Sequence, residues 1–389
     1  MNNQYDFIIS GAGLVGSLTA LQLSNNGYSC CLIEKNNLPE NKSYKNYSPL
    51  SLNYRSFLIL NNFGIWDLIK DYAYPVNRLQ IKSFNSLNRL SFESRDIGLD
   101  VLGYVVDRRR LLSTFLDLIT KASKIDLIQG DSVSKLITKE KSIEAHLESR
   151  QIIGSKNLIV SDGVNSKLKD LLNIESRVKD HFQSSYVFNA RGSFVKNSAI
   201  QIFNKYGIFA GIPYTKDSIN LVLSVNHDHE RELINNGDVK IDTLTRIFKG
   251  YVGSIHELDF VSKHPLFAVK ATQIMKKNIL LIGNSSQLLH PVGAQGFNLA
   301  LRNIDCFIKN YNTNLNIDDL SNLIEKDRKS VFTNIDFATE VFGGNKTTSR
   351  IFTFAACNIL KSSSCLQSKF LEKILGIESY PYLTIGSKV

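Results

Sequence analysis

A strand, a glycine-rich turn, a helix and a second strand open this chain, and few folds accommodate that order. Residues 5–10 are apolar enough for a buried strand, and the turn Gly11–Gly16, with the pattern GxGxxG, follows at once. The helix after the turn carries leucines on one face and ends at Gly27. A second strand over residues 29–33 stops at the acid Glu34. This order predicts a βαβ unit that binds a dinucleotide.

Each residue type of this unit has its own physical task. Gly11 allows the tight turn, Gly13 lets the backbone approach a pyrophosphate, and Gly16 lets the helix pack closely on the strand. The start of the helix offers free N–H groups and a positive dipole end to the phosphates. Glu34 would accept hydrogen bonds from the ribose hydroxyls of adenosine. A purely structural glycine turn would not require an acid at the end of the second strand.

Two further strands also run into turns that contain glycine and small polar residues. Residues 157–160 form a short apolar strand, and the turn Ser161–Lys167 follows it. Residues 278–282 form another, which runs into Gly283–Asn298. Doubly wound sheets bind ligands at the ends of such strands, so both turns are candidate cofactor contacts. For either turn taken alone, an ordinary loop after a buried strand is the alternative.

The second of these turns says more about the ligand. Asn284 can hydrogen-bond the sugar chain of a cofactor, and Pro291 fixes the backbone before a glycine-bearing turn. Residues 293–305 are expected to be helical, with an apolar stripe. The N-terminal amides of that helix would face an anion, such as the N1–C2=O edge of a reduced flavin.

In order and spacing, these three turns resemble the GxGxxG, DG and GD…P…GQG motifs of the class A flavin-dependent aromatic hydroxylases. Gly283–Pro291 followed by Gln295–Asn298 is most similar to the ubiquinone-biosynthesis hydroxylases of that group, which act on polyprenyl phenols. The likeness spans roughly residues 5–310. The chain departs from the usual pattern at Asn284, where most members have Asp, and at Ser48, where an Arg is common. Gly293-Ala294 stands where Ala-Gly is usual.

The resemblance implies an α/β fold in which a Rossmann-like FAD-binding domain is interleaved with an antiparallel β-sheet substrate domain, plus C-terminal helices. The expected FAD-binding domain comprises residues 1–75, 103–178 and 268–310. The expected substrate-binding β-sheet domain comprises residues 76–102 and 179–267, and residues 311–389 form the C-terminal helical region.

The resemblance also implies the chemistry. FAD would be the cofactor and NAD(P)H or another electron donor the cosubstrate, with O2 and a polyprenyl phenol as substrates. A flavin C4a-hydroperoxide would hydroxylate the aromatic ring. Pro291 and His290 are the expected catalytic residues. His290 would orient a backbone group or touch the substrate, and a hydrogen-bonded turn histidine without a further role is the alternative.

The cofactor contacts implied by the resemblance come from all three turns and from one arginine. Arg109 falls in an R-x-x-L-x-x-x-L register where the family has an Arg on the FAD pyrophosphate, and a solvated basic run at a helix start is the alternative. The expected contacts are Gly11, Gly13, Gly16, Glu34, Arg109, Asp162, Gly163, Gly283, Asn284, Pro291, Gly293, Gln295, Gly296 and Asn298.

Other functions of the same fold remain open. The alternatives are a prenyl reductase and a non-catalytic flavin-binding subunit of a biosynthetic complex. A halogenase is disfavoured, because the single tryptophan, Trp66, cannot supply a W-x-W motif.

Composition limits the partners. Lys and Arg exceed Asp and Glu by 46 to 36, and the resulting charge of +10 permits an anionic partner or reflects only a surface bias. No helix-turn-helix, zinc or RNP-like signature is present, so no nucleic acid partner is expected. The five cysteines form no CxxC pair and indicate reduced thiols. His227 and His229 lie in a polar, turn-like stretch and are not expected to be a ligand pair, so no metal site is expected.

The sequence also bears on localisation. No leader pattern and no stretch of about 18 apolar residues occurs, so a cytoplasmic protein without a membrane-spanning helix is expected. The apolar clusters 351–356 and 370–371 suggest a peripheral position on the inner membrane, and helices that pack on their own protein are the alternative. The basic residues that flank these clusters are Lys346, Arg350, Lys361, Lys369 and Lys373.

Overall fold

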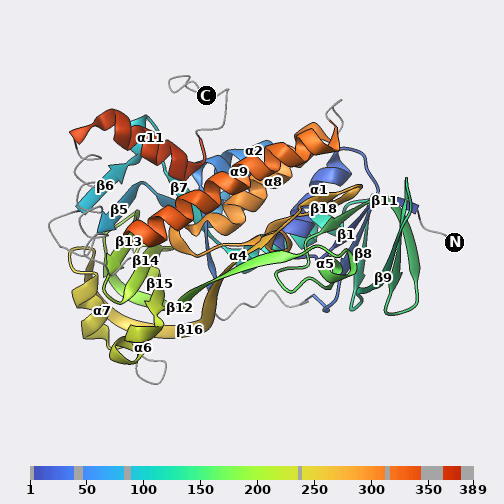
Figure 1. The fold of residues 1–389 in the computed structure, drawn as a ribbon. Helices are drawn as coiled ribbons and strands as arrows, with labels where there is room; N and C mark the ends of the chain where they lie inside the picture. Colours follow the sequence, from blue (N-terminus) through green and yellow to red (C-terminus); the bar gives the residue numbers. More distant parts are fainter. Residues whose placement is uncertain are drawn as a thin grey trace.

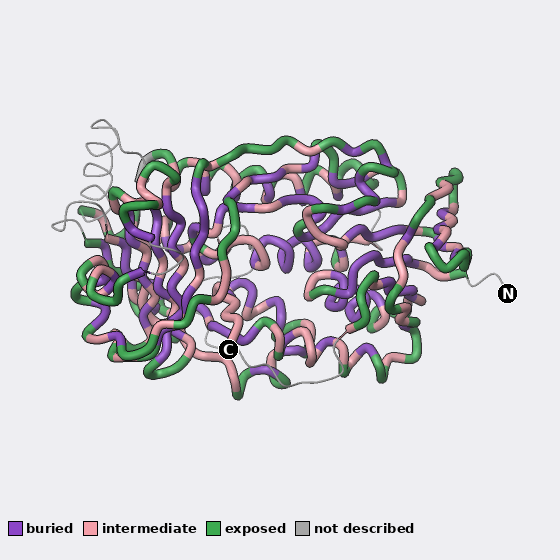
Figure 2. Tube along the Cα trace, turned by 90° about the horizontal axis from the view of Figure 1, so that it is seen from below, coloured by how far each residue is buried: buried purple, intermediate pink, exposed green. Residues whose placement is uncertain are grey.

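The computed structural model describes residues 4–38, 47–82, 89–234, 239–311, 316–342 and 362–377. Two large sheets lie in opposite halves of the molecule, and long helices cross the region between them (Figure 1). Buried positions gather on the strands of both halves and on helix turns between them (Figure 2).

The first sheet is built around β1, Gln4–Ser10. It pairs in parallel with β2, Cys30–Glu34, on one side and with β11, Ile152–Val160, on the other. β18, Ile279–Leu281, continues the parallel series beyond β11. Parallel strands end at the same edge, so the turns after β1, β11 and β18 lie side by side. The sheet is completed by β8 (Ile125–Gln129), β9 (Val133–Thr138), β10 (Ile143–Leu147) and β17 (Met275–Lys276).

Alternation along β1 divides the core in two. Phe7 and Ile9 pack on one side with the helices, and Ile8 points to the other side. The helices on the first side are α1 (Leu14–Asn25), α4 (Arg108–Ile119) and α8 (Gln295–Asn310). The short helix α5, Lys167–Leu171, packs on the other side through Leu168.

The second sheet is antiparallel except for the pair β13·β5. Its two longest strands, β12 and β16, pair along most of their length and run between the two halves of the molecule. The helices α6, His227–Leu233, and α7, Ile241–Ile247, cover its outer face. Its strand order is β19 (Gln287–Leu288), β16 (Val252–Ala271), β12 (Ser176–Phe194), β15 (Ser218–Asn226), β14 (Gly207–Pro213), β13 (Ser198–Asn204), β5 (Arg78–Lys82) and β6 (Arg89–Glu93).

A small third sheet lies next to α2. It has the order β3 (Pro49–Asn53), β7 (Gly103–Asp107) and β4 (Tyr74–Val76). The helices α2, Tyr54–Asn62, and α3, Trp66–Ile69, follow β3 along the chain.

The C-terminal region is helical where it is described. α9, Ile317–Phe337, continues into a π-helical turn at Ala338–Phe342, and α11, Ser364–Leu375, follows. Leu371 and Leu375 of α11 are buried in a cluster that includes Phe92 of the second sheet, so this helix packs on its own protein. The cluster 351–356 and Lys346, Arg350 and Lys361 lie outside the described residues.

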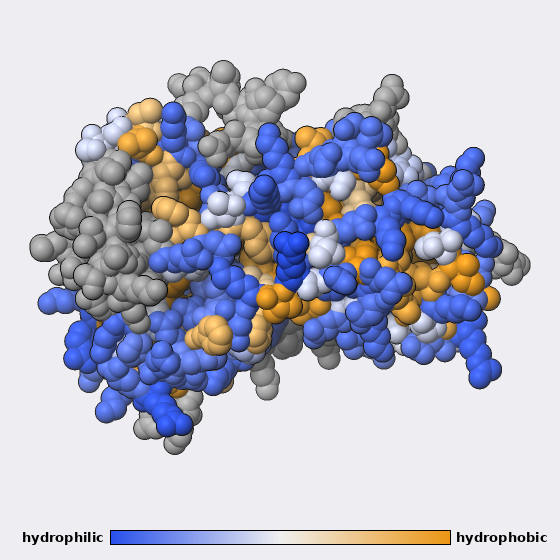
Figure 3. All heavy atoms as spheres, viewed as in Figure 1, coloured by the Kyte–Doolittle hydropathy of each residue, from blue (hydrophilic) through white to orange (hydrophobic). Residues whose placement is uncertain are grey.

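Within the described part of the chain, no helix combines the length and apolar character needed to cross a membrane. The face drawn in Figure 3 is largely hydrophilic, and apolar atoms show in smaller groups between the polar ones.

The predicted fold class is confirmed: an α/β part is interleaved along the chain with a mainly antiparallel sheet, and helices follow. One local prediction is wrong. The helix expected from residue 293 begins at Gln295, because Gly293 and Ala294 have left-handed backbone angles, φ 69° and 50°, which no α-helix contains. Cys30, Cys31, Cys306 and Cys365 are free thiols, and Cys357 lies outside the described residues.

Candidate functional site

The three glycine-containing turns come together at one edge of the first sheet. The N–H of Ser161 donates to the carbonyl of Ser10 over 2.8 Å, and the Ser161 hydroxyl donates to the same carbonyl. The hydroxyl of Ser285 reaches the carbonyl of Val160 at 2.5 Å. The structure therefore joins the turns that follow β1, β11 and β18 into one unit.

Two glycines of the first turn are required by packing within the protein. A Cβ added at Gly11, where φ is +97°, would lie 2.6 Å from the carbonyl oxygen of Ser161. A Cβ at Gly16 would lie 1.9 Å from the carbonyl oxygen of Gly11. Both positions therefore exclude any larger residue. The close approach of helix to strand expected at Gly16 is present.

Gly13 and Gly296 are not required by the protein itself. Neither has an atom within 4 Å of the position that a Cβ would take, and neither has a left-handed backbone. Gly296 is the second residue of α8, and its helical backbone does not require glycine. A group from outside the chain that approached the backbone closely would account for both glycines. Gly163 faces open space as well, although its φ of +94° alone favours glycine.

The helix starts give a second, independent indication of a ligand. Of the described helices with nine residues or more, α2, α4, α9 and α11 begin with a side chain that accepts a hydrogen bond from a first-turn N–H. α1 and α8 have no such side chain and no acid in the first turn. These two begin at the GxGxxG turn and at the Gly293-Ala294 turn. Their N-terminal amides are left to bind an anionic or electron-rich group.

Glu34 supports the first turn directly. One carboxylate oxygen accepts the N–H of Ala12 at 2.9 Å, and the other accepts the N–H of Asn36 at 3.1 Å. The side-chain amide of Asn36 also donates to this second oxygen, so the oxygen bound to Ala12 is the one that can accept a further bond, as the expected ribose contact requires.

Asp162 has a buried carboxylate oxygen, Oδ1, with no hydrogen-bond partner among the described residues. Burial raises the pKa of this carboxyl, and a hydrogen bond with Ser166 opposes the rise. A buried oxygen without a donor normally has a partner that the chain does not supply. A hydroxyl-bearing cofactor at this edge would supply one.

His290 is 1% exposed, and both of its ring nitrogens bind the protein. Nδ1 accepts the N–H of Val292 at 3.1 Å, and Nε2 lies 2.8 Å from Oε1 of Gln183. Burial, and then the nearby charge of His181, lower the pKa of His290 to about 3, so the ring is neutral. The ring therefore orients a backbone group beside Pro291, and substrate contact by His290 stays a prediction.

Gln295 and Asn298 are held by protein atoms. The Asn298 amide donates to the carbonyls of Ser51 and Ala294 and accepts from the N–H of Asn53 and the hydroxyl of Ser56, which is its full capacity. It braces α8 against the start of α2, and its expected cofactor contact stays a prediction.

The Gln295 amide is engaged by the carbonyls of Gly293 and Ile374, the latter in α11. Asn284 is exposed on the turn after β18. Gly283, with φ +66°, lies against Val15 of α1, which brings that turn close to the GxGxxG turn. The cofactor contacts expected of all three residues stay predictions.

Arg109 lies at the start of α4, half-buried between two exposed arginines. Its backbone N–H donates to the capping carboxylate of Asp107 at 2.9 Å. The guanidinium of Arg110 lies 4.1 Å over the ring of Tyr72, so the basic run is anchored rather than fully solvated. The contact of Arg109 with a pyrophosphate stays a prediction.

Arg328 is a site-supporting residue that sequence reasoning missed. It is 0% exposed in α9 and donates to the carbonyls of Ala271, at 2.5 Å, and Ser286, at 3.2 Å. Ser286 belongs to the turn after β18, so α9 holds that turn in place. A sequence signal existed: Arg328 lies on the helical stripe whose other members, Leu320, Ile324, Val331 and Ile335, are apolar and buried.

The second sheet turns a partly uncovered face toward the first half. Val187 pairs with Val222, which pairs with Ala210 in the next strand, so all three share a face. Farther along this face, Phe203 and Ile208 pack with residues of the flavin-motif segment such as Val292. We call the half-buried residues of this face the inward strip: Val187, Asn189, Gln201, Ala210, Ile212 and Val222.

The inward strip is neutral. Its hydrophobic members provide an apolar surface, and its two amides are partly engaged by the protein. Asn189 donates to the carbonyl of Tyr47, and Gln201 donates to that of Phe209. Sequence periodicity did not reveal this surface, because its residues come from four different strands.

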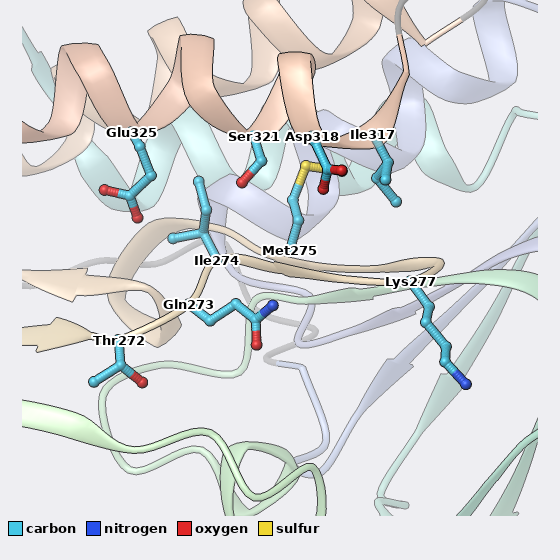
Figure 4. A pocket seen from close by; sticks show the side chains of 9 residues that line it. All are labelled: Thr272, Gln273, Ile274, Met275, Lys277, Ile317, Asp318, Ser321 and Glu325. Atoms are coloured by element: carbon cyan, nitrogen blue, oxygen red, sulfur yellow. The ribbon is translucent and has the colours of Figure 1, made fainter.

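A separate cavity of about 230 Å³ lies between the segment 272–277 and the start of α9. Asp318 and Ser321 project from α9 toward Met275, whereas Lys277 points away (Figure 4). None of the expected cofactor contacts lines this cavity, and we assign it no part in the flavin site. Its lining is Thr272, Gln273, Ile274, Met275, Lys277, Ile317, Asp318, Ser321 and Glu325.

Comparisons with known proteins identify the family. The FAD binding domain family matches residues 4–309. Ubiquinone hydroxylase UbiM of Neisseria meningitidis is 24% identical over 318 residues, which cover 79% of this chain and 69% of the relative. The 3-demethoxyubiquinol 3-hydroxylase of Escherichia coli is also 24% identical, with 79% of each chain covered.

Among solved structures, p-nitrophenol 4-monooxygenase PnpA from Pseudomonas putida DLL-E4 superposes with a TM-score of 0.77. It covers 96% of this chain and 99% of its own at 14% identity, a likeness of fold. The open glycines, the two uncapped helix starts and the unpartnered Asp162 oxygen fit FAD. The chain therefore belongs to the FAD binding domain family of the class A flavin-dependent aromatic hydroxylases.

Proposed function

We propose that this protein hydroxylates the aromatic ring of a polyprenyl phenol in ubiquinone biosynthesis, using FAD, O2 and NAD(P)H. The single observation that carries the proposal is the position of the inward strip, a neutral and partly uncovered surface turned toward the half that bears the flavin motifs. Relatives named as ubiquinone hydroxylases, at 24% identity, support the substrate class.

The chain's own residues would hold the cofactor in three places. The amides of the GxGxxG turn and the first turn of α1 would bind the pyrophosphate, with Arg109 beside them, and Glu34 would bind the ribose. Asp162 would accept a hydroxyl of the cofactor. Pro291 and the uncapped start of α8 would face the isoalloxazine edge. Bound FAD supplies the redox chemistry with O2.

The inward strip would orient the ring. Val187, Val222, Ala210 and Ile212 offer an apolar surface for the ring and the first part of a prenyl chain, and they exclude water from it. Asn189 lies at the polar end of the strip, where its amide oxygen accepts from Asn220 at 3.0 Å. Neutral groups of this kind suit an uncharged phenol, because an unpaired carboxylate on the ring would be costly to bury.

The test is turnover with a defined substrate. Purified protein should be yellow, and NAD(P)H oxidation should accelerate when a polyprenyl phenol and O2 are added. Mass spectrometry should show a product with one added oxygen atom. A product with two added hydrogens in its prenyl chain would indicate the prenyl reductase instead. Bound FAD without turnover on any phenol would favour a non-catalytic subunit.

A further inference from the structure

A chain of three hydrogen bonds connects the second sheet to the turn after Pro291. The N–H of Val292 donates to Nδ1 of His290, and His290 Nε2 lies 2.8 Å from Oε1 of Gln183. The amide nitrogen of Gln183 then donates to Oδ1 of Asn226 at 2.6 Å. The backbone N–H of Val292 can only donate, so Nδ1 of His290 accepts and the ring proton is on Nε2. Every bond in the chain therefore has a fixed direction.

The hydrogen bond between His290 and Gln183 is enclosed by protein. Gln183 is 8% exposed and His290 1% exposed, so solvent cannot replace either partner. The ring of His181 packs edge-on against His290 at a centroid distance of 4.9 Å. Loss of the Gln183 oxygen would leave the Nε2–H of His290 buried without an acceptor, which is unfavourable.

The strand that carries Gln183 is distorted where it meets His290. The pairing of β12 with β16 is interrupted between Asp180 and Ser184, and Phe182 has a left-handed φ of 52°. A left-handed residue other than glycine costs about 1–2 kcal/mol. Phe182 is 69% exposed and gains little from packing. The bulge therefore places its two neighbours, His181 and Gln183, against His290 at the expense of regular pairing.

The turn at the other end of the hydrogen-bond chain, Val292–Ala294, is also strained. Gly293 and Ala294 both have positive φ, and α8 begins directly after them. Ala294 has a Cβ, so this conformation needs support from its surroundings. The bond from the Val292 N–H to His290 supplies part of that support.

We infer that Gln183 is a positioning residue of the flavin site. It acts through His290: its amide oxygen keeps the ring proton on Nε2, which leaves Nδ1 to hold the Val292–Ala294 turn and the start of α8. The sheet that bears the inward strip thereby sets the shape of the turn that faces FAD. The inference rests on the flavin site and not on the identity of the phenol.

The test compares two buried glutamines of the same sheet. Gln183→Met removes the acceptor for His290. Gln80→Met is the matched control, because Gln80 is 2% exposed in β5 and binds Arg89 instead. Sulfite affinity of the oxidised flavoprotein, measured by bleaching without any phenol, reports the hydrogen-bond donors around the flavin. We expect the Kd for sulfite to be about tenfold higher in Gln183→Met than in the wild type, which is the effect of one lost hydrogen bond. We expect no change in Gln80→Met.

A second measurement needs no substitution at Gln183. Nitrogen-15 NMR of the histidine-labelled flavoprotein distinguishes the two ring tautomers, and His290→Asn identifies the signal. We expect the proton on Nε2. A proton on Nδ1, or equal sulfite affinities in the two glutamine variants, would overturn the inference. Because neither readout uses a phenol, a wrong proposal about the substrate leaves both results interpretable.

Discussion

The two large sheets differ in where they carry the residues that we propose to bind the cofactor and the substrate. In the first sheet they lie at the strand ends, in turns where glycines, backbone amides and two uncapped helix starts converge. In the second sheet they lie on a face, where side chains from four strands form the inward strip. The first arrangement presents the backbone to a ligand and the second presents side chains. Substitutions should therefore separate cofactor binding from substrate binding.

The largest expected effect is at the strand ends. Gly13→Val places a side chain in open space, so the apoprotein should lose no more than about 1 kcal/mol of stability, the cost of valine at the N-cap of α1. The same side chain would occupy the space of the pyrophosphate, and FAD affinity should fall about a thousandfold, or about 4 kcal/mol. Fluorescence titration of the apoprotein with FAD measures the affinity.

Gly16→Val is the contrasting variant. Its Cβ would meet the carbonyl oxygen of Gly11 at 1.9 Å, so it should lower the melting temperature of the apoprotein as well as the FAD affinity. Equal FAD affinities for Gly13→Val and the wild type would remove the case for a phosphate at this turn.

The next effect concerns Arg328, which links α9 to the end of β16 and to the turn after β18. Arg328→Met removes a buried guanidinium that donates to the carbonyls of Ala271 and Ser286 and pairs with Glu325, and it should cost about 3 kcal/mol in the free energy of unfolding. Arg95→Met is the control, because Arg95 pairs with Glu93 at an exposed position and its removal should cost less than about 0.5 kcal/mol. Urea unfolding of both variants measures the difference. Similar losses of unfolding free energy in the two variants would show that Arg328 does not hold the turn after β18 in place.

A smaller effect should appear at acidic pH. Burial lowers the pKa of His290 to about 3, whereas the ring in an unfolded chain titrates near 6.5. The unfolded state therefore takes up this proton first, and stability is lost as the pH falls from 6.5 toward 3. Relative to His290→Asn, the wild type should lose about 2 kcal/mol more between pH 7.5 and pH 5. Parallel pH profiles of the two proteins would show that the ring is not buried as described.

The same contrast explains what could be predicted from the sequence. The turn at Gly11–Gly16 is contiguous and ends in Glu34, so local spacing was enough to place it at a strand end. Asn298 and His290 were found as members of a motif, but their hydrogen bonds depend on Ser51 and Gln183, which are distant in sequence. Pair contacts of this kind leave no periodic trace.

The left-handed pair Gly293-Ala294 was missed for a different reason. Ala294 has no intrinsic preference for that conformation, and the protein around it imposes the turn. Arg328 did leave a trace, as the one charged residue on the buried stripe of α9. A stripe position occupied by arginine indicates buried acceptors, and the fold identifies them as two carbonyls and the carboxylate of Glu325.

The smallest expected effect concerns the inward strip of the second sheet. Ala210→Val adds two methyl groups to the inward strip, where Ala210 is half-buried and pairs with Val222. The KM for a polyprenyl phenol should rise about tenfold, or about 1.4 kcal/mol, because the ring loses room at this surface. FAD affinity should stay at the wild-type value, since no turn of the first sheet is changed. A variant that lost FAD without any change in KM would show that the face serves the cofactor, and the division between strand ends and sheet face would then fail.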